Sequence, residues 1–145
     1  MSQVHYYEVN VQWNEGRKGT LSSPVLNKTI ECATPPEFPN GMPDIWSPEH
    51  LYAAAINSCY MATFLAVAEN FNLPFRDFSC KTICKLEIIE GKYQITEAEI
   101  KPAVTLQNPE TDRDKAIKVL EKSKAACLVT NSMKTAVNLH INFNH

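Results

Sequence analysis

The sequence lacks an excess of charge of either sign. Lysine and arginine total 14 residues, aspartate and glutamate total 16, and the formal net charge is −2. Basic residues form no stripe, which leaves little electrostatic support for binding nucleic acid. The first ten residues lack the basic segment and apolar run of a signal peptide, and no apolar stretch approaches the ~18 residues that a membrane helix needs. We therefore expect a cytoplasmic protein with no nucleic-acid and no membrane partner.

The sequence also lacks internal repeats, low-complexity tracts and signs of a second domain. A length of 145 residues is enough for one domain to bury its own core, so we expect a single domain spanning 1–145. Five cysteines, an odd number, argue against a framework of structural disulfides. In a reducing compartment each thiol then either packs in the fold or takes part in the chemistry of the protein.

The pattern of apolar residues predicts an α+β fold. Two strands around the turn "NEGRKG" open the chain, and a third strand, "VLNKTIEC", follows them. The irregular, proline-rich loop "ATPPEFPNGMPDIW" leads to a long helix. Residues 77–106 then predict two long strands around "EGK", and residues 108–126 predict a second helix. A closing strand over 135–143 has four apolar side chains on one face: Val137, Leu139, Ile141 and Phe143. The element order is β-β-β-α-β-β-α-β.

The long helix is predicted from "SPEHLYAAAINSCYMATFLAVAEN", which begins at Ser47. Ser47 is a suitable N-cap, and Pro48 stands at the first helical position, where its missing N–H costs no hydrogen bond. A stripe of small side chains runs along one face, where another backbone can come close: Ala55, Cys59, Ala62 and Ala66. Free cysteine is itself a common core residue, so the pattern alone leaves the role of Cys59 open.

The other four cysteines fall into two groups. The predicted core face of one strand carries Cys80 and Cys84 together with Phe78, Thr82, Leu86 and Ile88. Cys80 and Cys84 would be about 13 Å apart along the strand, too far for a disulfide. We interpret both of them, and Cys32, as structural. Cys127 instead precedes the polar run "TNS", near a bend, where oriented N–H groups can stabilise a thiolate.

Three segments together resemble the OsmC/Ohr family of thiol-dependent peroxidases. They are "GRKGTLSS" in the first hairpin, "SPEHLYAAAINSCYMATFLAVAE" in the long helix and "CLVTNSMK" after the second helix. The resemblance covers nearly the whole chain, including the order of its elements. It implies an OsmC-like fold, in which an antiparallel sheet packs on the long central helix, and an intertwined homodimer.

The resemblance also implies roles for four residues. Cys59 resembles the peroxide-attacking cysteine of the family, and Cys127 resembles its resolving cysteine. Arg17 and Glu49 resemble the arginine and the glutamate that surround the reactive thiol. The implied enzyme reduces organic or other hydroperoxides, uses no cofactor or metal, and is recycled by an external dithiol of lipoyl or another type. Leu128 departs from the family, which usually has proline directly after the second cysteine.

The expected chemistry is a two-thiol cycle. The Cys59 thiolate attacks a hydroperoxide oxygen and becomes a sulfenic acid, which Cys127 converts to a disulfide. The guanidinium of Arg17 suits both the thiolate and the peroxide oxygens, and Glu49 would orient it. Glu49 and Cys59 lie about 15 Å apart along one straight helix, so they cannot share an arginine directly. We therefore expect the site to form between two subunits, with the Glu49 end of one central helix near Cys59 of its antiparallel mate.

Other interpretations stay open. The same fold could serve a binding or redox-sensing protein whose cysteines do not turn over. A thiol-based transferase or hydrolase needs a base, and His50 could approach a cysteine in space. A metal site built from Cys59, Cys127 and either His50 or His140 matches no zinc-motif spacing.

The proline-rich loop bears on substrate preference. Its apolar side chains could roof a pocket beside the thiol and favour organic hydroperoxides over hydrogen peroxide, or they could be ordinary loop anchors. These side chains are Phe38, Met42, Ile45 and Trp46.

Overall fold

The computed structural model describes residues 3–144, in which the chain forms two compact units, one up to Leu51 and one from Tyr52 onward. Each unit has its own sheet. The strands are β1 (Asn10–Glu15), β2 (Lys18–Ser23), β3 (Leu26–Ala33), β4 (Phe75–Ile89), β5 (Lys92–Leu106), β6 (Ala136–Leu139) and β7 (Asn142–Asn144). The helices are α1 (Pro48–Asn70), α2 (Pro109–Ala126) and α3 (Leu128–Asn131). That the whole chain is one domain stays a prediction.

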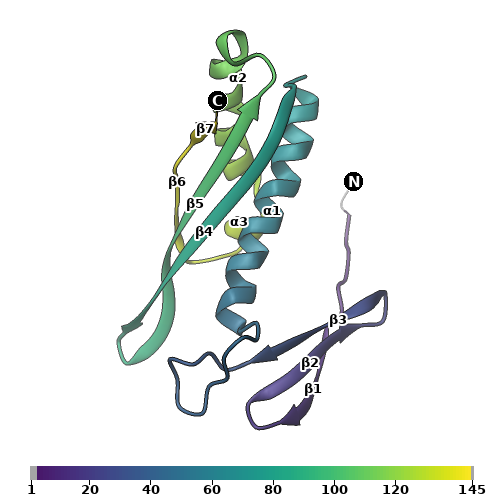
Figure 1. The fold of residues 1–145 in the computed structure, drawn as a ribbon, viewed down its shortest axis with the longest axis vertical. Helices are drawn as coiled ribbons and strands as arrows, with labels where there is room; N and C mark the ends of the chain where they lie inside the picture. The colour runs from purple at the N-terminus through teal and green to yellow at the C-terminus, as the bar shows by residue number, and fades with distance from the viewer. Residues whose placement is uncertain (1–2, 145) are drawn as a thin grey trace. The chain divides into compact units, whose positions relative to one another are not determined.

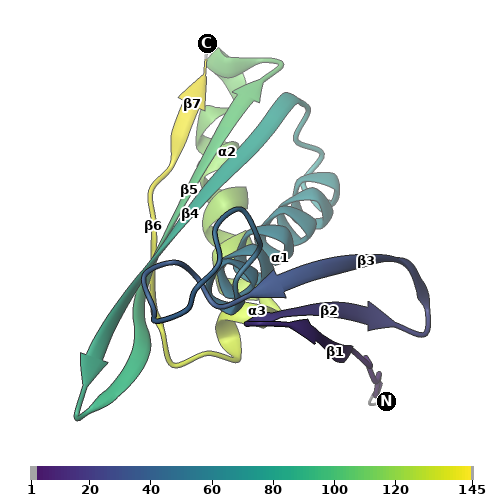
Figure 2. The same ribbon diagram turned by 60° about the horizontal axis from the view of Figure 1, so that its bottom comes forward.

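The first unit is a three-stranded antiparallel sheet in the order β1-β2-β3, followed by the proline-rich loop (Figure 2). The predicted hairpin and third strand are therefore confirmed. Gly16 adopts a φ of +53° in the first turn, a conformation that glycine takes without strain. The indole N–H of Trp13 donates to the carbonyl of Gly16 at 3.0 Å and closes this turn. Farther on, Gly41 passes so close to the backbone of Pro35 that any side chain there would clash.

Helix α1 begins as the sequence predicts. Ser47 is fully buried, and its Oγ accepts a hydrogen bond from the backbone N–H of His50 at 3.1 Å. Such an N-cap satisfies a donor that the first turn leaves free, and it is worth about 1 kcal/mol. The helix ends at Asn70, shortly before Asn72, whose φ of +53° cannot continue it.

The second unit packs α1 and α2 on one face of a four-stranded sheet (Figure 1). The two long strands and the second helix are confirmed. Glu90 and Gly91 both have positive φ, as a tight two-residue turn between β4 and β5 requires. Burying one large apolar side chain contributes roughly 1.5–3 kcal/mol. Fully buried apolar side chains of α1, α2 and β5 include Ile56, Phe64, Ile100, Val104, Val119 and Leu120.

The C-terminal segment differs from its prediction. The single strand expected over 135–143 is two short strands, β6 and β7, interrupted at His140 and Ile141. Both pair with β5 in parallel, so the sheet is mixed and not purely antiparallel. Parallel pairing needs a crossover, and α2 supplies it between β5 and β6. The apolar face is as predicted, because four side chains of this segment pack on the core: Val137, Leu139, Ile141 and Phe143. The short helix α3 was not expected.

The hairpin of β4 and β5 extends beyond the core. Cys80 and Cys84 pack against the core as predicted. The prediction is wrong for Leu86 and Ile88, which are 39% and 58% exposed. On the paired strands the core ends at Cys84 and its partner Ala98, and the register shifts by a β-bulge just beyond them. The alternation of apolar and polar residues along a strand indicates which side chains share a face. It does not indicate how much of that face the helices cover.

Helix α1 corrects one statement made from the sequence. A window of this helix has a mean hydropathy of 1.5, so it is long and apolar enough to cross a membrane. The expectation that no apolar stretch approaches that length is therefore wrong. Core helices pass the same test, and α1 carries Ile56, Tyr60, Phe64 and Ala68 into the core of the second unit. The helix is thus weak evidence for a membrane span.

Candidate redox site

The structure places Cys59 and Cys127 next to each other. Cys59 lies in the middle of α1 and is partly exposed, whereas Cys127 lies between α2 and α3 and is fully buried. The Cys127 side chain is a hydrogen-bond partner of the Cys59 sulfur, and both thiols are free. The two sulfurs that the resemblance singles out are therefore neighbours in the folded chain.

A buried hydrogen bond ties α1 to α2 beside these thiols. The hydroxyl of Tyr60 donates to the carbonyl of Leu120 at 2.9 Å, and both residues are fully buried. Burial raises the pKa of Tyr60 well above its usual range, and the nearby Cys80 and Cys127 add to the effect. Tyr60 therefore stays a neutral donor. Leaving a buried carbonyl unsatisfied costs about 1–3 kcal/mol, so this bond holds the two helices in register.

Hydrogen-bond donors surround the sulfur of Cys59. Partial burial raises the pKa of the Cys59 thiol, and four hydrogen bonds together lower it by more. In order of effect, the partners are the Val129 N–H, the Cys127 side chain, the Thr63 side chain and the Leu128 N–H. The pKa of Cys59 therefore lies below that of an ordinary cysteine. Since the thiolate is the nucleophilic form of cysteine, this is the sulfur suited to attack.

The polar run after Cys127 holds the corner between α2 and α3. The Cys127 carbonyl accepts hydrogen bonds from the Asn131 N–H at 3.0 Å and from Thr130 Oγ1 at 3.2 Å. The side-chain amide of Asn131 donates to the carbonyl of Ala125 at 3.0 Å, in the last turn of α2. The bend expected at this point is confirmed, and its backbone donors face Cys59.

Three groups of the site were missed from the sequence. Thr63 Oγ1 donates to the carbonyl of Cys59 at 2.8 Å and lies 4.0 Å from its sulfur. Its spacing of four residues from Cys59 on a helix was an available signal. The bend after Cys127 indicated oriented N–H groups near that cysteine, but it did not indicate that those of Leu128 and Val129 act on the sulfur of Cys59.

The remaining cysteines have different surroundings. Burial raises the pKa of Cys80 to about 11, and it raises that of Cys84 as well. Cys32 pairs with Gly19 in the ladder of the first unit and bridges to Trp46. These three thiols hold packing or ladder positions, in line with their structural interpretation.

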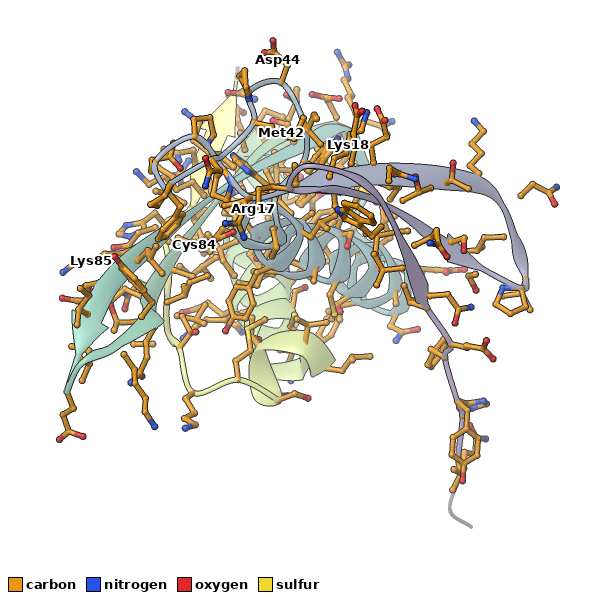
Figure 3. The ribbon with its side chains drawn as sticks, turned by 90° about the horizontal axis from the view of Figure 1, so that it is seen from below. Arg17, Lys18, Met42, Asp44, Cys84 and Lys85 are labelled. Carbon is orange, nitrogen blue, oxygen red and sulfur yellow. The ribbon has the colours of Figure 1, made fainter. Side chains whose placement is uncertain are left out.

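Arg17 lies at the exposed turn between β1 and β2 (Figure 3). Its carbonyl accepts a hydrogen bond from the N–H of Thr34 at 3.3 Å. Met42 of the proline-rich loop lies beside the same turn, with its sulfur 3.9 Å from where Gly16 would carry a Cβ. Across residues 3–144, the guanidinium has no carboxylate partner. Its role at the thiol stays a prediction.

Glu49 stands in the first turn of α1, where a carboxylate suits the positive end of the helix dipole. Its Oε1 is buried, yet no described residue donates a hydrogen bond to it. A buried acceptor without a donor costs about 1–3 kcal/mol, and more when it is charged. The structure does not pair Glu49 with Arg17, although the resemblance places both at one site.

The two histidines considered as metal ligands have other partners. His50 Nδ1 lies 2.7 Å from Ser47 Oγ, and its ring packs edge-on against Trp46. His140 points outward, as predicted, with Nε2 2.9 Å from a carboxylate oxygen of Glu99. In the part of the chain that the structure describes, no three His, Cys, Asp or Glu side chains are grouped so as to hold a metal ion.

The proline-rich loop forms an open pocket of about 350 Å³ with the start of α1. Ile45 and Trp46 are two of its lining residues, and Trp46 is 54% exposed. Pro36, Asp44 and His50 complete the lining. The loop thus presents a concave, largely apolar surface, and its use for a substrate stays a prediction.

Comparisons with known proteins identify the family of the chain and its fold. The model of a family described as OsmC-like protein matches residues 41–142. The uncharacterized protein YmaD of Bacillus subtilis is 22% identical over 144 residues, which cover 97% of this chain and 94% of YmaD.

Two solved structures illustrate the match in three dimensions. An OsmC-like protein of unknown function from Vibrio cholerae, VCA0330, is 19% identical with a TM-score of 0.85, over 95% of this chain and 99% of that one. An organic hydroperoxide resistance protein from Elizabethkingia anophelis is 20% identical with a TM-score of 0.79, over 99% and 100% of the two chains. The predicted α+β, OsmC-like fold is confirmed.

Proposed function

The chain belongs to the OsmC-like protein family, and from this premise we propose that it is a thiol-dependent peroxidase that reduces hydroperoxides. The observation that carries the proposal is the pairing of Cys127 with a Cys59 thiol of lowered pKa. Further support comes from similar solved structures, which include organic hydroperoxide resistance proteins from Elizabethkingia anophelis and Bacillus subtilis.

The proposed cycle has three steps. The thiolate of Cys59 attacks one oxygen of the hydroperoxide, the O–O bond breaks, and the other oxygen leaves as an alcohol or water after taking a proton. The sulfenic acid on Cys59 then reacts with the Cys127 thiol, which forms a disulfide and releases water. An external dithiol, of lipoyl or another type, reduces this disulfide and is itself oxidised. Each turnover thus moves two electrons from the dithiol to the peroxide.

Ionisation of Cys59 alone does not make a fast peroxidase. A free thiol with a pKa near 8.5 is already a few per cent ionised at neutral pH, so complete ionisation raises the rate by about tenfold to thirtyfold. A lower pKa also weakens the nucleophile. Additional stabilisation of the leaving oxygen is needed, and we assign it to the guanidinium of Arg17, oriented by Glu49.

We place Arg17 and Glu49 in a site shared by two subunits of an intertwined homodimer. The buried and unpartnered Oε1 of Glu49 supports a donor from outside the single chain. The exposed face of α1 supports a neighbour as well, since Met61 and Leu65 are each 44% exposed. Activity should therefore fall when dilution separates the subunits, in step with the dimer fraction measured by ultracentrifugation. A fully active monomer would contradict the shared site.

The proposal extends to substrate and compartment. The apolar pocket of the proline-rich loop favours organic hydroperoxides over hydrogen peroxide. A reducing, cytoplasmic setting suits a cycle in which free thiols are restored after each turnover.

One experiment tests the cycle most directly. The reduced protein is titrated with cumene hydroperoxide and, separately, with hydrogen peroxide, and the products are mapped by mass spectrometry. We expect a Cys59–Cys127 disulfide at one equivalent of oxidant, and repeated peroxide consumption when dithiothreitol is present. A disulfide that forms once but does not turn over would instead indicate a redox sensor. Oxidation that never links the two cysteines would contradict the proposed cycle.

A further inference from the structure

The two sulfurs of the candidate site differ in access to solvent. Cys59 is partly exposed on α1, whereas Cys127 has no accessible surface. On its inner side Cys127 lies close enough to the fully buried Tyr60 to affect its ionisation. A molecule that approaches this pair from solvent therefore meets Cys59 first.

The backbone holds Cys127 in this position. Its N–H donates to the carbonyl of Lys124 at 3.3 Å, and its own carbonyl accepts from Asn131 and Thr130 at 3.0 and 3.2 Å. Turning Cys127 out to solvent would break these bonds, and each is worth about 0.5–1.5 kcal/mol. The difference in access is thus built into the corner between α2 and α3.

When a disulfide between these residues is reduced, solvent access and leaving-group ability favour attack at different sulfurs. A thiolate displaces the better leaving group faster, and the lowered pKa of Cys59 would direct attack to the Cys127 sulfur. Attack also requires an approach opposite to the breaking S–S bond. Cys127 is fully buried, so no such approach from solvent is open at its sulfur, whereas part of Cys59 is accessible. A sulfur that no reagent can reach does not react, so access determines which sulfur the reductant attacks.

We propose that the external reductant attacks the sulfur of Cys59 and expels Cys127 as the leaving thiol. This inference rests on the proposed function. The reductant thiolate forms a mixed disulfide with Cys59, the Cys59–Cys127 bond breaks, and the Cys127 thiolate takes up a proton. The second thiol of the reductant then attacks the reductant's own sulfur in the mixed disulfide. This releases the Cys59 thiolate and an oxidised, cyclic reductant.

This order of events favours a dithiol over a monothiol as the reductant. The released Cys127 remains beside Cys59 and can attack the mixed disulfide, which restores the original disulfide and expels the reductant. The reaction of the disulfide with a monothiol is therefore mostly reversed. A dithiol carries its second thiol at an effective concentration in the millimolar range or above, so that it competes with Cys127.

The site of attack can be read directly. The Cys59–Cys127 disulfide is formed with diamide, exposed briefly to glutathione as a monothiol probe, quenched with acid, alkylated and mapped by mass spectrometry. We expect glutathione on Cys59 and an alkylated Cys127 at least about ten times more often than the reverse, as exposure dictates. Equal amounts, or an excess on Cys127, would overturn the proposal. Failure of a peroxide to form the disulfide would count against the proposed function alone, since diamide makes the same link without it.

Two variants, each lacking one cysteine of the pair, give a second measurement. In Cys127→Ala and in Cys59→Ala, the remaining thiol of the pair is labelled with 5,5′-dithiobis(2-nitrobenzoate), and each cysteine is quantified by mass spectrometry. Cys59 should be labelled at least about tenfold faster than Cys127, because labelling requires access. Cys80, present in both variants, provides an internal reference, and circular dichroism checks the fold. Labelling of Cys127 at the rate of Cys59 would overturn the proposal.

Discussion

The second unit carries cysteines in two contrasting regions, the Cys59–Cys127 corner and the core face of β4. Tyr60 is near both, since Cys80 and Cys127 each affect its ionisation. On β4, burial dominates and raises the pKa of Cys80 to about 11. At the corner, backbone and side-chain donors outweigh burial and lower the pKa of Cys59. Residue type is the same in both regions, so the balance between burial and hydrogen-bond donors decides which thiol is ionised.

Removing sulfur from each region in turn gives the largest expected contrast. Cys59→Ser should reduce hydroperoxide turnover by about 10³-fold or more, because the attacking nucleophile is lost. Cys80→Ala should change turnover by roughly twofold at most, since its effect is on packing. Turnover is followed as loss of cumene hydroperoxide in the presence of dithiothreitol. A Cys80 variant as inactive as the Cys59 variant would erase the distinction between the regions.

The pH dependence of alkylation sharpens the same contrast. Only the thiolate reacts with iodoacetamide, so the rate at each cysteine rises with pH through its own pKa. Cys59 should reach its half-maximal rate at a lower pH than an ordinary cysteine does. Cys80 should reach its half-maximal rate only near pH 11. At neutral pH Cys59 should therefore react more than about tenfold faster, because its larger thiolate fraction outweighs the lower nucleophilicity of its thiolate, as peptide mapping can measure. Coinciding pH profiles would refute the difference in pKa.

Leu128→Pro removes one backbone donor from the Cys59 sulfur. Cys127 has φ −67° and ψ 110°, which is compatible with a following proline, and the first position of α3 tolerates one. The N–H of Leu128 has the smallest effect of the four partners of the sulfur, so its loss should raise the pKa of Cys59 by no more than about one unit.

Leu128→Ala is the matched control for this variant. It keeps the N–H and shortens a side chain that is 70% exposed, so the pKa of Cys59 should not move. Thiolate absorbance at 240 nm during a pH titration reports both values. If alanine shifted the pKa as much as proline, the side chain and not the N–H would be responsible.

A comparably small effect is expected at Thr63, whose side chain precedes the Leu128 N–H among the partners of the Cys59 sulfur. Its hydroxyl proton is used on the Cys59 carbonyl at 2.8 Å, and its oxygen lies 4.0 Å from the sulfur. Thr63→Val should therefore change the alkylation rate of Cys59 at neutral pH by less than about threefold. Thr63→Ser, which keeps the hydroxyl, should match the natural protein. A tenfold loss in the valine variant would make Thr63 a principal donor to the sulfur.

The fold was predictable wherever a short stretch of sequence determines the local structure. The N-cap at Ser47 and the turn at Glu90–Gly91 are signals of a few residues, and both are found as expected. The pairing of β6 and β7 with β5 depends on residues far apart in the chain, so the mixed sheet could not be read from alternation. The exposure of Leu86 likewise depends on where the core ends.

The candidate site was predictable in its side chains and not in its backbone. The resemblance singled out Cys59 and Cys127, and the folded chain makes them neighbours. The donors that lower the pKa of Cys59 include the N–H groups of Val129 and Leu128, which carry no residue signature. Across residues 3–144, no residue donates a hydrogen bond to Oε1 of Glu49 and no carboxylate pairs with the Arg17 guanidinium, so their roles at the thiol stay predictions.

The complete burial of Cys127 also bears on how the protein would age under oxidant stress. In the proposed cycle, excess peroxide reaches a sulfenic acid on Cys59 and can drive it to the irreversible sulfinic and sulfonic acids. The buried thiol of Cys127 is not accessible to peroxide in this way. Damage would then accumulate on one sulfur of the pair, and molecules that have lost their activity would still keep an intact, reduced Cys127.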